Sequence, residues 1–191
     1  SVQVAQSGAG VVKPGVITYN VLKSALCIDS SGSMHGMIET IYANYVHLLK
    51  MTSKESSEFA LLKFSNDVAC YKCDYKKKTY DHVTSYAKNG KPIGSGNLTA
   101  LMNSTFDGAT NFTEHLKTEI VNLLNAGFNL LLASDTDILS GENLTVLKQV
   151  LHHPKAKTQL FIIFDSESSY QQAIRELGAI SKYITYFSAP K

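Results

Sequence analysis

The sequence from Ala25 to Met37 reads Ala-Leu-Cys-Ile-Asp-Ser-Ser-Gly-Ser-Met-His-Gly-Met. Its apolar part, 25–28, ends in the carboxylate of Asp29, and three hydroxyl residues follow within four positions: Ser30, Ser31 and Ser33. A carboxylate and several hydroxyls after a buried strand form a tightly turned loop that is rich in oxygen atoms. Hard divalent cations prefer oxygen ligands, so this loop is a candidate cation site.

Apolar runs of strand length alternate along the chain with amphipathic runs of helical spacing. We predict helices at 37–51, 112–124, 143–152 and 170–180, and strands at 21–28, 59–64, 68–75, 128–133, 160–164 and 183–187. The polar, basic segment 76–95 is predicted to be a surface connection with one short helical turn. Alternation of this kind is typical of a mostly parallel sheet that is covered by helices on both faces.

The predicted fold class is therefore α/β, a Rossmann-like doubly wound sheet of six strands with one antiparallel edge strand, which a hairpin at 65–67 provides. Three of these strands end in an aspartate: Asp29, Asp135 and Asp165. Ligands of open doubly wound sheets bind beyond the carboxyl ends of the strands, where the strand order reverses. If the strands before Asp29 and Asp135 are neighbours there, their carboxylates converge.

The spacing Asp29-x-Ser31-x-Ser33 resembles the first loop of the metal-ion-dependent adhesion site (MIDAS) of von Willebrand factor A (VWA) domains. Thr110, in Gly-Ala-Thr-Asn, is similar to the threonine of the second loop, and Asp135, after an apolar strand, is similar to the aspartate of the third. Two departures are mild: Ala109 replaces a glycine, and Thr136 follows Asp135 where the family often has glycine. The resemblance implies a VWA-like domain at 21–191, preceded by an arm or edge strand at 1–20.

This resemblance implies a set of metal ligands with few charges: Asp29, Ser31, Ser33, Thr110 and Asp135. A cation with so few charged ligands stays electrophilic and can take one more oxygen, which in the family comes from a Glu or Asp of a partner protein. Mg²⁺ suits a nearly octahedral site that keeps waters, and Mn²⁺ or Ca²⁺ could use the same ligands. The expected function is a divalent-cation-dependent protein-binding module that is not an enzyme.

Two alternatives belong to other functional classes. A metal-assisted hydrolase would need a general base beside a metal-bound water, for which the candidates are Asp137, Asp165 and His35. A nucleic-acid-associated module would use the segment 71–91, which mixes lysines and tyrosines. A short lysine run is more often a solvated surface, so nucleic acid is not the expected partner.

Composition sets the remaining expectations. The chain has 191 residues and a net charge of +2, which indicates one domain and no strongly charged partner. No apolar run approaches the roughly 18 residues of a membrane helix, and no signal peptide is visible. Three cysteines favour a reducing compartment and hence the cytoplasm, although the Asn-x-Ser/Thr triplets at Asn97, Asn103, Asn111 and Asn143 would fit secretion.

The pair Cys70-x-x-Cys73 is the one further motif with possible chemistry. It lies in a predicted strand, where residues three apart face opposite sides of the sheet. A redox-active pair normally opens a helix instead, so we expect two structural cysteines here.

Overall fold

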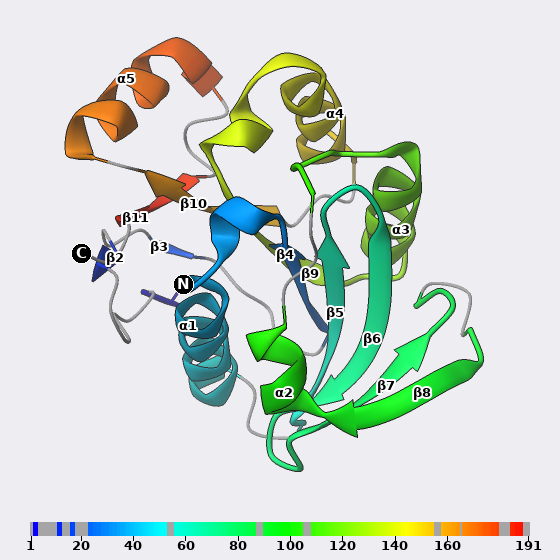
Figure 1. Ribbon diagram of the computed structural model, residues 1–191. Helices are drawn as coiled ribbons and strands as arrows, with labels where there is room; N and C mark the ends of the chain where they lie inside the picture. The colour runs from blue at the N-terminus through cyan, green and yellow to red at the C-terminus, as the bar shows by residue number, and fades with distance from the viewer. Residues whose placement is uncertain are drawn as a thin grey trace.

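One mixed sheet of nine strands, in the order β2-β11-β10-β9-β4-β5-β6-β7-β8, forms the centre of the molecule (Figure 1). The computed structural model describes residues 2–3, 11–12, 16–17, 23–52, 56–86, 90–104, 108–154, 158–164, 166–179 and 184–188. Its strands are β1 (Val2–Gln3), β2 (Val11–Val12), β3 (Val16–Ile17), β4 (Ser24–Asp29), β5 (Glu58–Phe64), β6 (Val68–Asp74), β7 (Thr79–Val83), β8 (Pro92–Asn97), β9 (Asn129–Asp135), β10 (Thr158–Phe164) and β11 (Ile184–Ser188).

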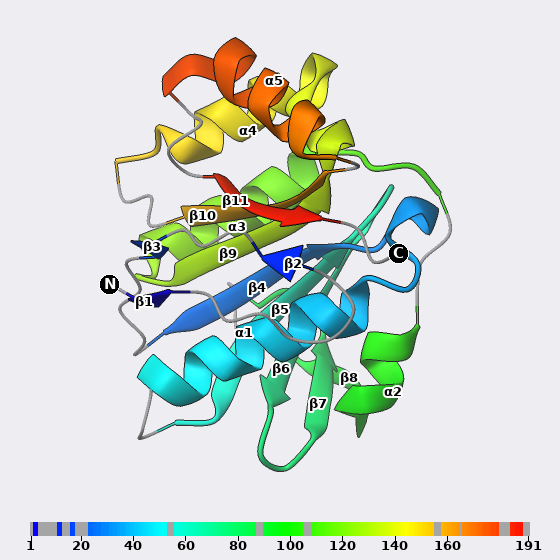
Figure 2. The same cartoon turned by 90° about the vertical axis from the view of Figure 1, so that its left-hand side faces the viewer.

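Five α-helices and two short 3₁₀ helices complete the described secondary structure. They are α1 (Ile38–Thr52), α2 (Leu98–Asn103), α3 (Glu114–Asn125), α4 (Gly141–Leu151), α5 (Glu167–Leu177), η1 (Gly32–Met34) and η2 (Thr136–Leu139). Figure 2 shows α1 on one side of the sheet and α4 and α5 on the other. Among the residues that the structure describes, we find no helix with the length and apolar character needed to cross a membrane.

The fold class predicted from the sequence is confirmed. Strands β11, β10, β9, β4 and β5 run parallel, and β6 pairs antiparallel with β5. These six strands correspond to the six predicted ones. The sheet is wider than predicted, because β2 joins one edge beside β11 and β7 and β8 extend the other beside β6.

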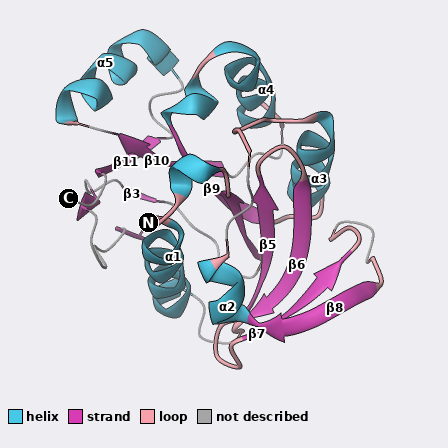
Figure 3. Ribbon diagram, in the orientation of Figure 1, coloured by secondary structure: helices cyan, strands magenta, loops and turns pink. Residues whose placement is uncertain are grey.

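The interpretation of 76–95 as a surface connection was wrong. This segment contains β7 and most of β8, which continue the sheet as an antiparallel meander (Figure 3). All residues of these two strands are exposed or half-buried except Val83, which is buried. A strand with little to bury lacks the apolar alternation from which strands are recognised in a sequence.

Strand β4 lies at the centre of two hydrophobic cores, and all six of its residues are buried. Leu26 and Ile28 pack into the core beneath α1 and α2, whereas Ala25 and Cys27 pack into the core beneath α3 and α4. This two-sided burial explains why the strand is continuously apolar up to Asp29.

Cys70 and Cys73 also belong to these two cores, one on each face of β6. Both thiols are buried and unpaired by any disulfide. The prediction that the two side chains point to opposite faces is therefore confirmed.

Candidate metal centre

Asp29 is the last residue of β4, and its side chain is completely buried. The neighbouring strand β9 is parallel to β4, with Ile28 paired to Ala133, and it ends at Asp135. Strand β5 lies on the other side of β4, so the chain order reverses at this point of the sheet. The two aspartates thus meet at the carboxyl edge, as their positions after apolar strands predicted.

Three groups donate hydrogen bonds to the Asp29 carboxylate. The backbone N–H of Ser31 donates to Oδ1 at 2.8 Å. The hydroxyls of Thr110 and Ser134 both donate to Oδ2, at 2.8 Å and 2.7 Å. Three segments therefore fix the orientation of the carboxylate: the loop after β4, the loop before α3 and the end of β9.

The hydroxyls of Ser31 and Ser33 extend this arrangement toward the surface. Ser31 Oγ lies 3.1 Å from Ser33 Oγ and 3.0 Å from Thr110 Oγ1. Ser33 Oγ in turn donates to Asp135 Oδ2. Ser31 is buried and Ser33 is exposed, so the chain of oxygens runs from the interior to solvent. The structure thus brings together all five side chains that the sequence predicted.

When both of its carboxylates are ionised, this oxygen cluster (Asp29, Ser31, Ser33, Thr110 and Asp135) cannot satisfy all its contacts by hydrogen bonding. With both carboxylates ionised, the three hydroxyls carry one proton each. The Thr110 proton goes to Asp29 and the Ser33 proton goes to Asp135. The single Ser31 proton then has two short oxygen contacts to serve. One pair of oxygens faces each other through lone pairs, an arrangement that a cation would relieve.

Burial is the largest influence on Asp29 and raises the pKa of its carboxyl group. The hydrogen bonds from Ser134, Ser31 and Thr110 act in the opposite direction because they favour the ionised form. The pKa of Asp137 is raised as well, first by the negative charge of Asp135, then by partial desolvation and by Asp29. The acidic side chains near the cluster therefore repel one another, and a cation would stabilise them together.

The loop that carries Thr110 is held by a residue that the sequence did not point to. Asn143, on α4, donates from Nδ2 to the Thr110 carbonyl at 3.0 Å and accepts from the Phe112 N–H at 2.8 Å.

Ser134 is a second residue that the sequence analysis missed, as a hydrogen-bond partner of Asp29. Its position beside Asp135 at the end of a strand was the only available signal, and the sequence does not say toward which neighbour its hydroxyl points.

The three candidate general bases are placed differently. Asp137 is exposed, and its N–H donates to Asp135 Oδ1 at 3.0 Å, so it lies at the rim of the cluster. His35 is exposed and lines a small cavity together with Glu39 and Met102. Asp165 lies outside the described residues.

The tyrosines of the segment 71–91 are used largely in packing. Tyr71 is buried, stacks on His82 with ring centroids 4.8 Å apart, and meets Tyr80 edge-on at 5.4 Å. Tyr75 is buried as well. The lysines at 76–78 are exposed on the turn between β6 and β7.

The donor set fits a hard cation in its chemistry. It offers two carboxylates and three hydroxyls, and oxygen ligands of this kind suit Mg²⁺, Mn²⁺ or Ca²⁺. Within the described part of the chain, no group of three or more His, Cys, Asp or Glu side chains is arranged to hold a metal ion. Any metal at this place would thus depend on hydroxyl ligands as much as on carboxylates.

Comparison with known proteins finds a distant structural likeness. No known family matches the sequence, and no curated protein matches it. One solved structure that the chain is similar to is the ArnB paralog VWA2 from Sulfolobus acidocaldarius, with 14% identity and a TM-score of 0.33. The alignment covers 98% of this chain and 48% of the other, so this chain spans about half the length of that protein.

Proposed function

We propose that this chain is a divalent-cation-dependent protein-binding module. In this proposal Asp29, Ser31, Ser33, Thr110 and Asp135 hold a Mg²⁺ ion, or Mn²⁺ or Ca²⁺ in its place, at the carboxyl end of the sheet. When bound, the metal would supply an electrophilic centre for a Glu or Asp carboxylate of a partner protein. The module would not be an enzyme.

The oxygen cluster is the observation that carries this proposal. Three loops that are far apart in the sequence contribute hydroxyls and carboxylates to one connected network, with Ser33 and Asp135 separated by 102 positions. With both carboxylates ionised, the network has one proton too few for its short oxygen contacts, and its two carboxylates repel that of the neighbouring Asp137. Both features are unfavourable in the protein alone, and both are relieved by a cation.

The exposure of the cluster supports binding rather than a purely structural role for the metal. Asp29, Ser31 and Thr110 are buried, whereas Ser33 is exposed and Asp135 is half-buried. A cation held among them would keep one side open to solvent, from which a carboxylate could approach. The buried members would hold the ligand set rigid.

Metal titration of the whole chain tests the first half of the proposal. We expect Mn²⁺ to bind to the wild type in calorimetry and in paramagnetic spectra, and Mg²⁺ to compete with it. Asp135→Asn should lower the affinity at least about tenfold, because charge-assisted contacts contribute roughly 1.5–3 kcal/mol. Asp81→Asn, an exposed aspartate on β7, is the control and should leave the affinity unchanged. Equal binding by the three proteins would contradict the metal site.

A peptide array tests the second half. The wild-type chain should retain peptides that contain Glu or Asp in the presence of Mg²⁺ and release them in a chelator. Matched peptides with Gln or Asn should not be retained. Retention that is insensitive to the chelator, or that Asp135→Asn leaves unchanged, would contradict metal-mediated recognition. Metal-dependent hydrolysis of the peptides would favour the hydrolase alternative instead.

A further inference from the structure

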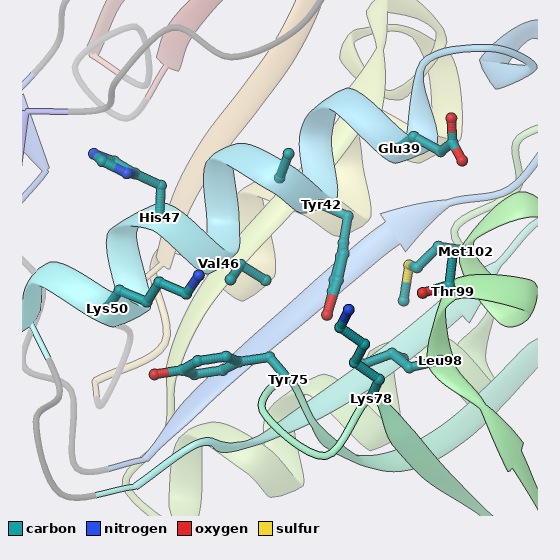
Figure 4. A pocket seen from close by; sticks show the side chains of 11 residues that line it. Glu39, Tyr42, Val46, His47, Lys50, Tyr75, Lys78, Leu98, Thr99 and Met102 are labelled. Atoms are coloured by element: carbon teal, nitrogen blue, oxygen red, sulfur yellow. The ribbon is translucent and has the colours of Figure 1, made fainter.

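A cavity of about 520 Å³ lies between α1, the turn that joins β6 to β7, and the beginning of α2 (Figure 4). None of the residues that line it belongs to the oxygen cluster. Its volume falls within the range of about 300–1,000 Å³ that is typical of small-molecule sites. The cavity is thus a second candidate site, independent of the proposed metal.

One side of the cavity is apolar and aromatic. Tyr42 and Val46 come from α1, and Leu98 and Met102 come from α2. Tyr75, at the start of the turn, adds a second aromatic ring. These residues belong to, or pack against, the hydrophobic core beneath α1, so this wall has a fixed shape. A planar apolar group would find both area and aromatic partners here.

The lining of the cavity also carries positive charge. Figure 4 shows the side chains of Lys50 and Lys78 directed into the space between α1 and the turn. The Lys50 ammonium lies 5.9 Å from the centroid of the Tyr75 ring. Neither lysine takes part in an ion pair within the described residues, and Glu39 is the only acidic residue of the lining.

The backbone holds Lys78 in an unusual conformation. It is the one non-glycine residue with a positive φ, +57°, among the residues that the structure describes. Glycine and asparagine adopt this left-handed region more easily than lysine does. The conformation is fixed because the Lys78 carbonyl accepts from the Leu98 N–H at 2.9 Å. The Asp74 carboxylate also accepts from the N–H groups of Lys76 and Lys77, both at 2.9 Å.

We propose that this cavity binds a small molecule with a planar apolar body and one anionic group, a carboxylate or a phosphate. The planar body lies along Tyr42 and Tyr75, and the anion lies between the ammonium groups of Lys50 and Lys78. Glu39, near the opposite end of the lining, disfavours a second anionic group there. Glycine would suit the backbone conformation at position 78 better than lysine does. The proposal explains the lysine there, because its ammonium binds the anionic group of the ligand.

Three related probes test the proposal on the full chain: 2-naphthoate, 2-naphthyl phosphate and the neutral 2-naphthamide. Binding is followed by calorimetry and by amide shifts in NMR spectra. We expect one or both anions to bind at least about tenfold more tightly than the amide, with shifts at Val46, Leu98 and Met102. The preferred anion identifies the carboxylate or phosphate class.

Two variants separate loss of binding from loss of folding. Lys78→Gly removes the ammonium but suits the positive φ, so stability should be kept or raised while the affinity falls about tenfold. Lys77→Gly, next to it on the same turn and outside the lining, should leave the affinity unchanged. Tighter binding of the neutral amide, no binding of either anion, or equal affinities of wild type and Lys78→Gly would overturn the proposal. A chelator should have no effect, which distinguishes this site from the proposed metal site.

Discussion

The hydroxyl oxygens of Ser31 and Thr110 lie 3.0 Å apart, although 79 positions separate the two residues. This contact joins the loop after β4 to the loop before α3, and through Thr110 it reaches the buried carboxylate of Asp29. It is also one of the two contacts that share the single Ser31 proton. A substitution at Thr110 can therefore separate the structural role of the cluster from its proposed role in metal binding.

Thr110→Val should reduce the effect of a divalent cation on stability. The substitution keeps the shape of the side chain and removes the hydroxyl that would ligate the metal. A ligand at 100 times its Kd stabilises a protein by about 2.7 kcal/mol, so the wild type should gain roughly that much from metal at this concentration. A variant that binds the metal about tenfold more weakly should gain only about 1.4 kcal/mol at the same concentration. Thermal unfolding with Mg²⁺ and with a chelator measures the difference.

The control is Thr79→Val, an exposed threonine at the start of β7. It should show the full metal-dependent gain. In the chelator, Thr110→Val should be less stable than the wild type by about 1–3 kcal/mol, because the buried Asp29 carboxylate loses a donor. A metal-dependent gain as large in Thr110→Val as in the wild type would show that the cation binds elsewhere.

Two glycines near the cluster should respond in opposite ways to alanine. Gly108 has a φ of +125°, and a Cβ there would overlap with Asn66 Nδ2, which would have to move. Gly108→Ala should therefore destabilise the fold by about 1–3 kcal/mol and disturb the loop that carries Thr110. Gly32 lies between the two serines, yet open space surrounds its Cβ position and its φ is ordinary, so Gly32→Ala should be tolerated.

Urea unfolding of both variants, together with Mn²⁺ affinity, measures these effects. Equal stability of the two proteins would contradict the assigned role of Gly108. A loss of affinity in Gly32→Ala without a loss of stability would instead show that the close approach of the metal needs glycine there.

Lys63 should make the stability of the protein depend on alkaline pH. Its side chain is completely buried, and burial lowers its pKa from 10.5 to about 8. Between these two values the unfolded chain binds more protons at this residue than the folded one, so the Lys63 contribution to stability rises with pH. Below about pH 8 both states are protonated and the full cost of burying the cation remains.

The measurement is the difference between the wild type and Lys63→Met in urea unfolding at pH 7, 8, 9 and 10. Over this pH range, the free energy of unfolding of the wild type should rise by about 1–3 kcal/mol relative to that of the variant. Buried thiols and phenols act in the opposite direction, since burial raises the pKa of Cys70 to about 11 and of Tyr71 to about 12. These groups are common to both proteins and cancel in the difference. A difference that is independent of pH would contradict the lowered pKa.

The cysteines should be chemically inert in the folded protein. Cys27, Cys70 and Cys73 are buried, and burial raises the pKa of each thiol, so little of the reactive thiolate forms at neutral pH. An aromatic disulfide reagent should react at least about 100-fold more slowly with the native chain than with the chain in denaturant, where three thiols should titrate. Rapid reaction of Cys70 and Cys73 as a pair would revive a redox role.

The central elements could be predicted because their residues carry strong and consistent signals. Strands β4 and β9 are continuously apolar, since helices cover both of their faces. Helix α1 was expected at 37–51 and is observed at Ile38–Thr52, because one buried stripe recurs at helical spacing. The five residues of the oxygen cluster were predicted from the resemblance of three short motifs to the MIDAS of VWA domains, and each motif follows or precedes such an element.

The remainder depends on contacts that a sequence does not encode locally. Strands β7 and β8 are stabilised by pairing and bury few side chains, so neither gives a pattern. Asn143, on α4, donates a hydrogen bond to the carbonyl of Thr110, which lies in a loop 33 positions earlier in the chain. The cavity beside α1 is lined by residues of α1, of the turn at Lys78 and of α2, and a hydrogen bond between Leu98 and Lys78 joins the last two. Such long-range relationships need the assembled fold.

The parallel pairing of β4 with β9 has a consequence for the order of folding. Strands β5, β6, β7 and β8 follow one another as hairpins, and hairpin contacts of low sequence separation form early. The union of β4 and β9 brings together residues such as Ser24 and Asn129, which requires closing a long loop and is expected late. Ser33 reaches Asp135 only after that step. A cation that binds at the proposed site should therefore leave the rates of the early folding steps unchanged. Its binding during refolding should occur only when the native topology is complete.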